Sequence, residues 1–173
     1  MAYLFLVRLD SVICVTIEYL ADRRDVIPTL ARWLHAEWGH CRPNETVEDR
    51  VARLERTCGH RQIPTTFVAL ASDQLLGCAS LVQHDMVTRP KLSPWLAGVF
   101  VAPEHRRRGI GAALVERVVQ ETRALDIPRL YLYTPGDGTL YVRLGWSILE
   151  HTFYHELWGN QPVTIMELAT NAR

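Results

Sequence analysis

The pattern of apolar and polar positions in the first third of the chain predicts one strand and two helices. Residues 15–20, VTIEYL, alternate apolar and polar side chains, which is typical of a half-buried strand. In the stretch 22–39, apolar side chains recur three and four positions apart and predict a helix. A second helix follows, with Asn44 or Thr46 as its N-cap and Gly59 at its end.

The middle of the chain predicts three strands. Residues 66–71 and 75–82 flank a short polar turn, which indicates a β-hairpin. After a polar loop, residues 95–101, WLAGVFV, form an almost continuous apolar run. Such a run is typical of a strand that is buried on both faces, so we expect it inside the sheet.

A long amphipathic helix is predicted to begin near Gly109. Its inward stripe is expected to comprise Ile110, Leu114, Val118 and Leu125. Its outward face is expected to comprise Glu116, Arg117, Gln120, Glu121 and Arg123. We therefore expect this helix to lie on the sheet with all of these charged side chains in solvent.

The last third of the chain predicts three further strands and a short helix. Residues 129–134 form a strand, GDGTLYVRLG contains a helix ended by Gly145, and two strands follow at about 146–153 and 162–169. The element order β α α β β β α β α β β predicts an α/β (α+β) fold, a mixed sheet with helices against it. We expect a single domain over residues 1–173, in which about residues 1–14 are an extension without an assigned element.

Charge and the N-terminal composition argue against several classes of function. The 19 basic and 19 acidic side chains balance, so no overall field attracts nucleic acid or an anionic membrane surface. Arg8 and Asp10 interrupt the apolar N-terminal stretch, so we expect neither a signal peptide nor a membrane span. We therefore predict a cytoplasmic protein without nucleic-acid or membrane partners.

The cysteines do not indicate disulfides or a metal. All four are spread over about half of a chain that has enough apolar residues for a core, so we expect free thiols. The HC at 40–41 and the CGH at 58–60 do not have the spacing of zinc ligands. We expect no metal site.

The segment VFVAPEHRRRGIGAAL places a glycine-rich turn between the apolar strand and the long helix. The first N–H groups of a helix lack internal partners, and glycines let a ligand approach them, so the turn is a candidate anion site. A P-loop would need Lys and then Ser or Thr after the second glycine, and a dinucleotide-binding turn would need glycine where Leu114 stands. Both are excluded, whereas a plain helix start beside solvated arginines stays an alternative.

The spacing Arg106-x-x-Gly109-x-Gly111, after the strand VFVAP and before LYVRLGW about thirty residues later, resembles the GNAT superfamily of acyl-CoA-dependent N-acetyltransferases. Tyr141 occupies the tyrosine position of the family's Tyr-x-x-x-Gly-Phe segment. The resemblance extends over roughly residues 15–170. It implies a mostly antiparallel central sheet of about seven strands, with helices on both faces and splayed central strands.

The same resemblance implies that acetyl-CoA is the cosubstrate and that no metal takes part. Its pantetheine arm is implied to pair with the backbone of Val99 and Val101, and a backbone N–H near Phe100 or Val101 to polarise the thioester carbonyl. Its pyrophosphate is implied to lie on the N–H groups of the turn. The residues implied to bind acetyl-CoA are Val99, Phe100, Val101, Arg106, Arg107, Arg108, Gly109, Ile110, Gly111, Ala112 and Tyr141.

Tyr141 is also implied to be the acid at the leaving sulfur, whereas the base has no implied position. Many relatives carry a glutamate on the strand that is WLAGVFV here, and this sequence has no carboxylate there. An amine is mostly protonated at neutral pH, so a base or a water relay is required. The candidates are His84 and Asp85 after the hairpin, Glu37 on the first helix, or a water held by a backbone carbonyl.

The resemblance therefore implies an N-acetyltransferase that moves an acetyl group directly to a primary amine within a ternary complex. The acceptor is expected to be a small molecule or a peptide amine. Trp38 and Trp158 are among the aromatic side chains that would favour an apolar or aromatic acceptor body. The alternative is a non-catalytic acyl-CoA-binding sensor, and homodimerisation is left open.

Overall fold

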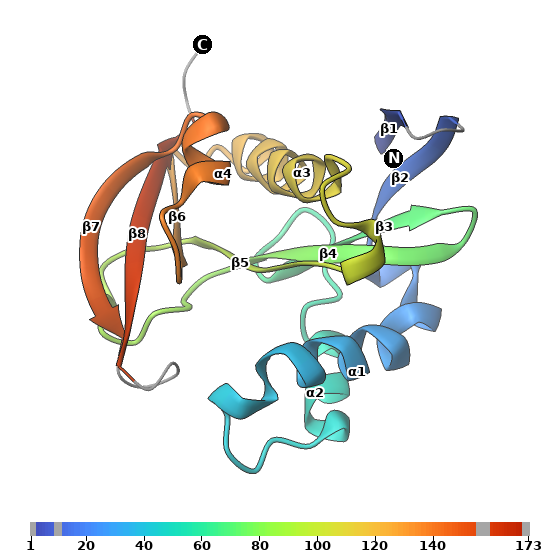
Figure 1. Ribbon diagram of the computed structural model, residues 1–173, viewed down its shortest axis with the longest axis horizontal. Coiled ribbons are helices and arrows are strands. Elements are labelled where there is room, and N and C mark those ends of the chain that lie inside the picture. The colour runs from blue at the N-terminus through green and yellow to red at the C-terminus, as the bar shows by residue number, and fades with distance from the viewer. Residues whose placement is uncertain (1–2, 9–11, 155–159, 171–173) are drawn as a thin grey trace.

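The computed structural model describes residues 3–8, 12–154 and 160–170. Within this part of the chain, eight strands form one sheet in the order β1-β2-β3-β4-β5-β6-β8-β7 (Figure 1). The strands are β1 (Tyr3–Arg8), β2 (Val12–Tyr19), β3 (Thr65–Ala71), β4 (Gln74–Val82), β5 (Trp95–Val101), β6 (Arg129–Thr134), β7 (Ser147–Tyr154) and β8 (Gln161–Ala169). The α-helices are α1 (Ile27–Trp38), α2 (Val47–Glu55), α3 (Ile110–Ala124) and α4 (Thr139–Arg143), and short 3-10 helices lie at Leu20–Asp22, Arg24–Val26, Gly39–Cys41 and Pro103–His105.

Neighbouring strands are antiparallel except β5 and β6, which run parallel. The predicted mixed, mostly antiparallel α/β sheet is therefore confirmed. Among the described residues it has one strand more than expected, because β1 pairs with β2 from Tyr3↔Ile17 to Arg8↔Val12. This strand lies in the stretch to which the sequence pattern assigned no element, and it extends one edge of the sheet.

Helices cover both faces of the sheet, as predicted (Figure 1). α3 packs on one face through Leu114 and Val118, in a core that includes Phe67 of β3. α1 and α2 pack on the other face through a second cluster that includes Leu30 and Leu54. The sheet thus lies between two apolar layers, and each layer contains side chains of the helices and of the strands.

α2 begins with a capping box. The Thr46 hydroxyl accepts the Asp49 N–H at 3.1 Å, and the Asp49 carboxylate accepts the Thr46 N–H at 3.0 Å. Thr46 rather than Asn44 is therefore the N-cap. The expected end at Gly59 is wrong, because α2 ends at Glu55, where the Thr57 N–H and hydroxyl both donate to the Leu54 carbonyl.

Two charged side chains of α3 are buried, which corrects the expectation that they face solvent. Arg117 and Glu121 form an ion pair at 3.0 Å one helical turn apart, and the Tyr19 hydroxyl donates to Glu121 at 2.9 Å. The Arg117 guanidinium carbon also lies 4.1 Å from the centre of the Phe67 ring. Because the pair balances its own charge and stacks on an aromatic ring, it can be buried against β2 and β3.

β5 and β6 separate soon after they meet. They share one register pair, Trp95↔Tyr131, and the Tyr131 N–H donates to the Pro94 carbonyl at 3.0 Å. Beyond Trp95 the strands diverge and the sheet opens between them, as predicted for the central strands (Figure 1). The expected burial of β5 on both faces holds for its first residues but not for Gly98, which is exposed at this opening.

The four cysteines are free thiols, as predicted. None of the helices in residues 3–8, 12–154 and 160–170 combines the length and the apolar character needed to cross a membrane. In the same ranges, no three His, Cys, Asp or Glu side chains lie close enough together to hold a metal ion.

Candidate functional site

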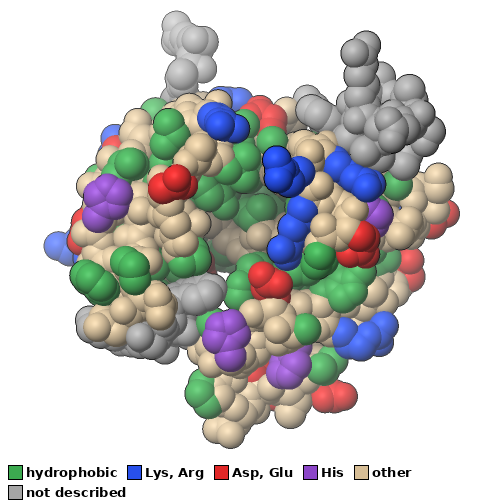
Figure 2. Space-filling view, in the orientation of Figure 1, with side chains coloured by type: hydrophobic (Ala, Val, Ile, Leu, Met, Phe, Trp, Pro, Cys, Tyr) green, Lys and Arg blue, Asp and Glu red, His purple; other side chains and the backbone are tan. Residues whose placement is uncertain are grey.

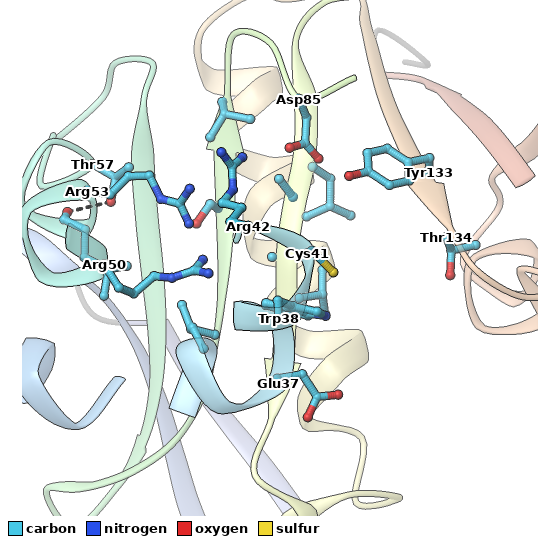
Figure 3. Close-up of a pocket in the computed structure, with 18 of the residues that line it drawn as sticks. Glu37, Trp38, Cys41, Arg42, Arg50, Arg53, Thr57, Asp85, Tyr133 and Thr134 are labelled. Carbon is cyan, nitrogen blue, oxygen red and sulfur yellow. Dashed lines mark hydrogen bonds between the residues drawn. The ribbon is translucent and has the colours of Figure 1, made fainter. Parts of the chain in front are cut away.

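A cleft of about 490 Å³ lies where β5 and β6 diverge. Its walls come from α1, the loop after it, α2, β4, β5, the end of β6 and α4 (Figure 3). All four residues predicted as acid or base line this one cleft, although they come from three different parts of the chain: Glu37, His84, Asp85 and Tyr141. Val99 of β5 lines it as well.

Tyr141 is held in place by the short helix α4. The Leu144 and Trp146 N–H groups both donate to the Tyr141 carbonyl, and the Trp146 indole packs against the Tyr141 ring at 6.1 Å between centroids. Burial raises the pKa of the Tyr141 hydroxyl above its ordinary value of 10.0. The hydroxyl has no hydrogen-bond partner among the described residues. At neutral pH the hydroxyl therefore keeps its proton and can donate a hydrogen bond into the cleft.

Asp85 follows β4 and is a half-buried residue of the cleft wall. Burial raises the pKa of its carboxyl to about 6, although Arg42 and Arg53 act in the opposite direction. Figure 3 shows the hydroxyl of Tyr133, on β6, directed toward this carboxyl. Asp85 forms no ion pair within the described chain, so at pH 7 it is a largely ionised carboxylate with an elevated proton affinity.

Glu37 and His84 are less enclosed. The Glu37 carboxylate lies 3.6 Å from Nη2 of Arg106, and its side chain is 43% exposed. Figure 3 shows that Glu37 points away from Asp85. His84 is an exposed residue at the rim. The structure thus brings the three candidate bases to one cleft and gives them different surroundings.

β5 contains a bulge where it borders the cleft. Its register with β4 changes from Phe100↔Cys78 to Ala97↔Ser80, so β5 has one residue more than β4 over this stretch. Gly98, inside the bulge, has a φ of 59°, which a residue with a side chain adopts only with strain. The bulge and the divergence from β6 leave the β5 backbone around Val99 open on the cleft side.

The turn between β5 and α3 exposes a row of backbone donors. The six N–H groups from Arg107 to Ala112 find no acceptor in the described part of the chain, and the first intrahelical bond is Ala113 N–H to Gly109 carbonyl at 3.0 Å. We call this row the N–H cradle, residues 107–112. Because α3 is 15 residues long, its dipole adds positive potential at the same place.

The two glycines leave the space in front of the N–H cradle empty. A Cβ added at Gly109 would meet no heavy atom within 4 Å, and one added at Gly111 would meet only Cγ2 of Val101 at 3.7 Å. Gly109 also has a φ of 83°, which favours glycine. The geometry therefore fits a phosphate group that approaches the backbone closely.

The three arginines of the turn have different positions. Nε of Arg106 donates to the Val101 carbonyl at 2.9 Å, so this side chain ties the turn to β5 and, through Glu37, to α1. Arg107 has a φ of 61°, in the left-handed region, and Arg107 and Arg108 form no ion pairs with described residues. Several basic side chains lie along one side of the hollow in the middle of this face (Figure 2).

The sequence pattern did not single out a second group of arginines at the cleft. Arg42 precedes α2, and Arg50 and Arg53 lie three residues apart on α2; all three line the cleft (Figure 3). We call them the arginine cluster. The sequence does show two arginines three residues apart on a predicted amphipathic helix, but such a pair usually faces solvent. Among the predicted aromatic residues, Trp38 lines the cleft, and Trp158 lies outside the described residues.

Comparisons with known proteins agree with this geometry. The profile of the Acetyltransferase (GNAT) family matches residues 27–146. A search of curated protein sequences gave no match. A solved aminoglycoside 6'-acetyltransferase type Ii is similar in structure, with 18% identity and a TM-score of 0.69, and the match covers 91% of this chain and 98% of that one.

Two further solved structures carry the cosubstrate. Spermidine N-acetyltransferase from Vibrio cholerae, in complex with CoA and spermine, has 21% identity and a TM-score of 0.65, with 90% of this chain and 95% of that chain covered. A putative acetyltransferase from Salmonella typhimurium, with its cofactor acetyl-CoA, has 19% identity and a TM-score of 0.69, with 92% and 95% covered. At these identities the structures establish the fold, while the family profile spans most of the chain. The chain therefore belongs to the GNAT family of acetyltransferases.

Proposed function

We propose that this protein transfers an acetyl group from acetyl-CoA to the nitrogen of a primary amine. One observation carries the proposal: Tyr141 and Asp85 line the same cleft as the open backbone of β5, and that strand leads directly into the N–H cradle. A phosphate-bearing donor held at the cradle has its reactive end within reach of β5 and the cleft. Membership of the GNAT family supports the same reaction.

The residues of this chain fit acetyl-CoA. The N–H cradle offers six unpaired donors to the two phosphates, and the absence of side chains at Gly109 and Gly111 lets the phosphates approach. The free edge of β5 at Val99 and Val101 can pair with the amide groups of the pantetheine arm as an additional strand would. Acetyl-CoA, when bound, supplies the acyl group as an activated thioester.

Asp85 is the base that the surroundings favour. An amine acceptor is mostly protonated at pH 7 and must lose a proton before it attacks. A carboxylate whose pKa is about 6 is still ionised at pH 7 and is a stronger base than an ordinary aspartate. Glu37 is engaged by Arg106, and His84 lies at the exposed rim, so neither offers the same combination of enclosure and proton affinity.

Tyr141 stabilises the leaving sulfur by hydrogen bonding. Burial raises the pKa of its hydroxyl further above 10, whereas a thiol titrates near about 8.5. Complete proton transfer from Tyr141 to the thiolate is therefore unfavourable. The hydroxyl keeps its proton and donates a hydrogen bond, and the low polarity around it strengthens that bond.

The test combines two measurements on the purified protein. Acetyl-CoA binding is measured by calorimetry, and thiol release is followed with a panel of amino acids, short peptides, polyamines and aminoglycosides. Binding together with amine-dependent thiol release and acetylated product in the mass spectrum is the expected result. Binding without turnover on every acceptor would overturn the proposal and support the non-catalytic sensor. An absence of acetyl-CoA binding would overturn both.

A further inference from the structure

The arginine cluster gives one wall of the cleft a strong positive charge. Arg42 comes from the loop before α2, and Arg50 and Arg53 come from α2 itself. Figure 3 shows the three guanidinium groups directed toward one another from this wall. Asp85 and Tyr133 lie toward the opposite side of the cleft (Figure 3). The cleft therefore has a cationic wall and, across from it, a carboxylate.

Within the arginine cluster, one carboxylate pairs with two of the three guanidinium groups. Glu45 forms ion pairs with Arg50 and, at 3.0 Å, with Arg53. Arg42 forms no ion pair within 4 Å with a described residue. Burial and, after it, the charges of Arg50 and Arg42 together lower the pKa of Arg53 to about 10. The positive charges therefore repel one another, and the two carboxylates near them, Glu45 and Asp85, balance two of the three.

Arg50 also has donors without acceptors. Its side chain is 8% exposed, and its Nε and Nη2 atoms have no hydrogen-bond partner, because Nη2 is close to Glu45 but not aligned with it. Buried charged donors that stay unpaired are costly, so native sites usually provide an acceptor. Nε of Arg50 has no acceptor among the described residues, and an anion in the cleft would provide one.

The arginine cluster is separate from the N–H cradle. The cradle begins α3, which covers one face of the sheet, whereas α2 packs on the opposite face (Figure 1). An anion held by the cluster is therefore a different group from one held by the cradle. Other parts of the cleft are lined by apolar side chains that include Leu34, Trp38 and Leu96.

We propose that the acceptor is an amine that also carries a carboxylate, and that Arg42, Arg50 and Arg53 bind the carboxylate while the amine faces β5. This inference rests on the proposed acetyl transfer. Guanidinium groups suit a carboxylate because they donate parallel hydrogen bonds with matching geometry. The carboxylate belongs either to a free amino acid or to the acidic first residue of a peptide, and the two sources share the recognised chemistry. Polyamines and aminoglycosides, which carry only positive charge, do not fit the cluster.

The test compares matched acceptors at saturating acetyl-CoA. Each of a series of α- and ω-amino acids is paired with its uncharged amide, and peptides beginning with Asp or Glu are paired with peptides beginning with Asn or Gln. We expect kcat/KM to be about 10- to 100-fold higher for the carboxylate member of the preferred pair. The series also locates the best spacing between amine and carboxylate and distinguishes free amino acids from peptides.

Arginine variants test whether this preference comes from the arginine cluster. Arg42→Gln and Arg53→Gln should each bring the ratio of kcat/KM for the carboxylate to kcat/KM for its amide close to one. This ratio is the readout because both arginines also lower the pKa of Asp85, so their loss affects turnover of both acceptors. Arg56→Gln, at the exposed end of α2, is the matched control and should keep the preference. Circular dichroism checks that each variant is folded, and Arg50 is not substituted because it is buried.

The outcomes separate this inference from the proposed function. Equal turnover of amides, or higher turnover of spermidine, would overturn the inference while acetyl transfer stands. If no amine is acetylated, calorimetry with the complex of protein and CoA decides. Binding of a carboxylate-bearing amine, lost for its amide and in Arg53→Gln, supports the cluster as its site, and no binding overturns the inference.

Discussion

The two anion-attracting regions of this molecule are built from different parts of the chain. The N–H cradle consists of backbone donors at the start of α3, and its specificity depends on the absence of side chains at Gly109 and Gly111. The arginine cluster consists of side chains, held by the helix α2 and a single carboxylate, Glu45. The first region lies on one side of an opened sheet and the second on the other.

The comparison distinguishes an anion site that comes with the fold from one that depends on side chains particular to this chain. Backbone N–H groups are present in every chain that adopts the turn, so the cradle suits a donor molecule common to a whole family. Guanidinium groups depend on three particular residues, so the arginine cluster suits an acceptor of this protein. Four substitutions test the division, from the largest expected effect to the smallest.

Gly111→Val should break the cradle and leave the cluster intact. The side chain fills the space that a phosphate needs, whereas its Cβ would be at an ordinary 3.7 Å from Val101, so the fold tolerates it. We expect acetyl-CoA affinity to fall by about 100-fold or more, since several charge-assisted hydrogen bonds are lost. Calorimetry measures it. Gly136→Val, at an exposed turn with open space, is the control, and retained affinity in Gly111→Val would refute the cradle.

Tyr141→Phe should slow acetyl transfer without changing the N–H cradle or the arginine cluster. We expect kcat to fall by about 100-fold, because the hydrogen bond to the leaving sulfur is lost, while the affinity for acetyl-CoA stays the same. Steady-state kinetics and calorimetry report the two quantities. Tyr131→Phe, in a half-buried tyrosine of β6, is the matched control. Unchanged turnover across the pH range would remove Tyr141 from the mechanism.

Asp85→Asn should change the pH dependence of turnover. A base must be ionised to act, so in the unsubstituted protein kcat/KM should rise with pH and level off above about 6, the pKa of Asp85. In the variant we expect that rise to disappear and kcat/KM at pH 7 to fall about 10-fold or more. Asp126→Asn, on the surface, is the control. A variant that keeps the rise near pH 6 would assign the base to His84, Glu37 or a water.

Thr46→Ala should weaken the arginine cluster indirectly. It removes one half of the capping box of α2, the helix that carries Arg50 and Arg53. We expect a loss of about 1 kcal/mol in the free energy of unfolding, measured in urea, and unchanged acetyl-CoA affinity. Thr88→Ala, at an exposed threonine whose hydroxyl forms no hydrogen bond with a described residue, is the control. An equal loss of stability in both variants would mean that the capping box does not specifically stabilise α2.

Much of the fold was predictable because it depends on local patterns. The hairpin of β3 and β4, the apolar strand β5 and the turn with Gly109 and Gly111 each follow from short stretches of sequence. The position of Tyr141 relative to that turn came from a family resemblance. The cleft itself, which joins Glu37, Asp85 and Tyr141, depends on where distant elements meet and was not visible in any one stretch.

The charged residues show what the patterns miss. Arg117 and Glu121 were expected in solvent, yet they are buried because they neutralise each other and stack on Phe67. Arg50 and Arg53 were not singled out, because a helical pattern treats charge as a mark of the solvent face. The first pair is buried by Tyr19 and Phe67, and the second lines a cleft shared with Asp85. All three of these residues are far away in the sequence, where periodicity does not register them.

Because β5 and β6 share a single register pair, the sheet has two parts that meet at one point. One part contains β1 to β5, and the other contains β6, β8 and β7. Trp95 lies at that point, fully buried, with its indole N–H donating to the Leu92 carbonyl at 2.7 Å and its ring against Tyr131 and Tyr133. Packing around this one indole therefore holds β5 against β6 at the point from which the two strands diverge. A residue that lines no part of the cleft thus joins two of the strands that form its walls.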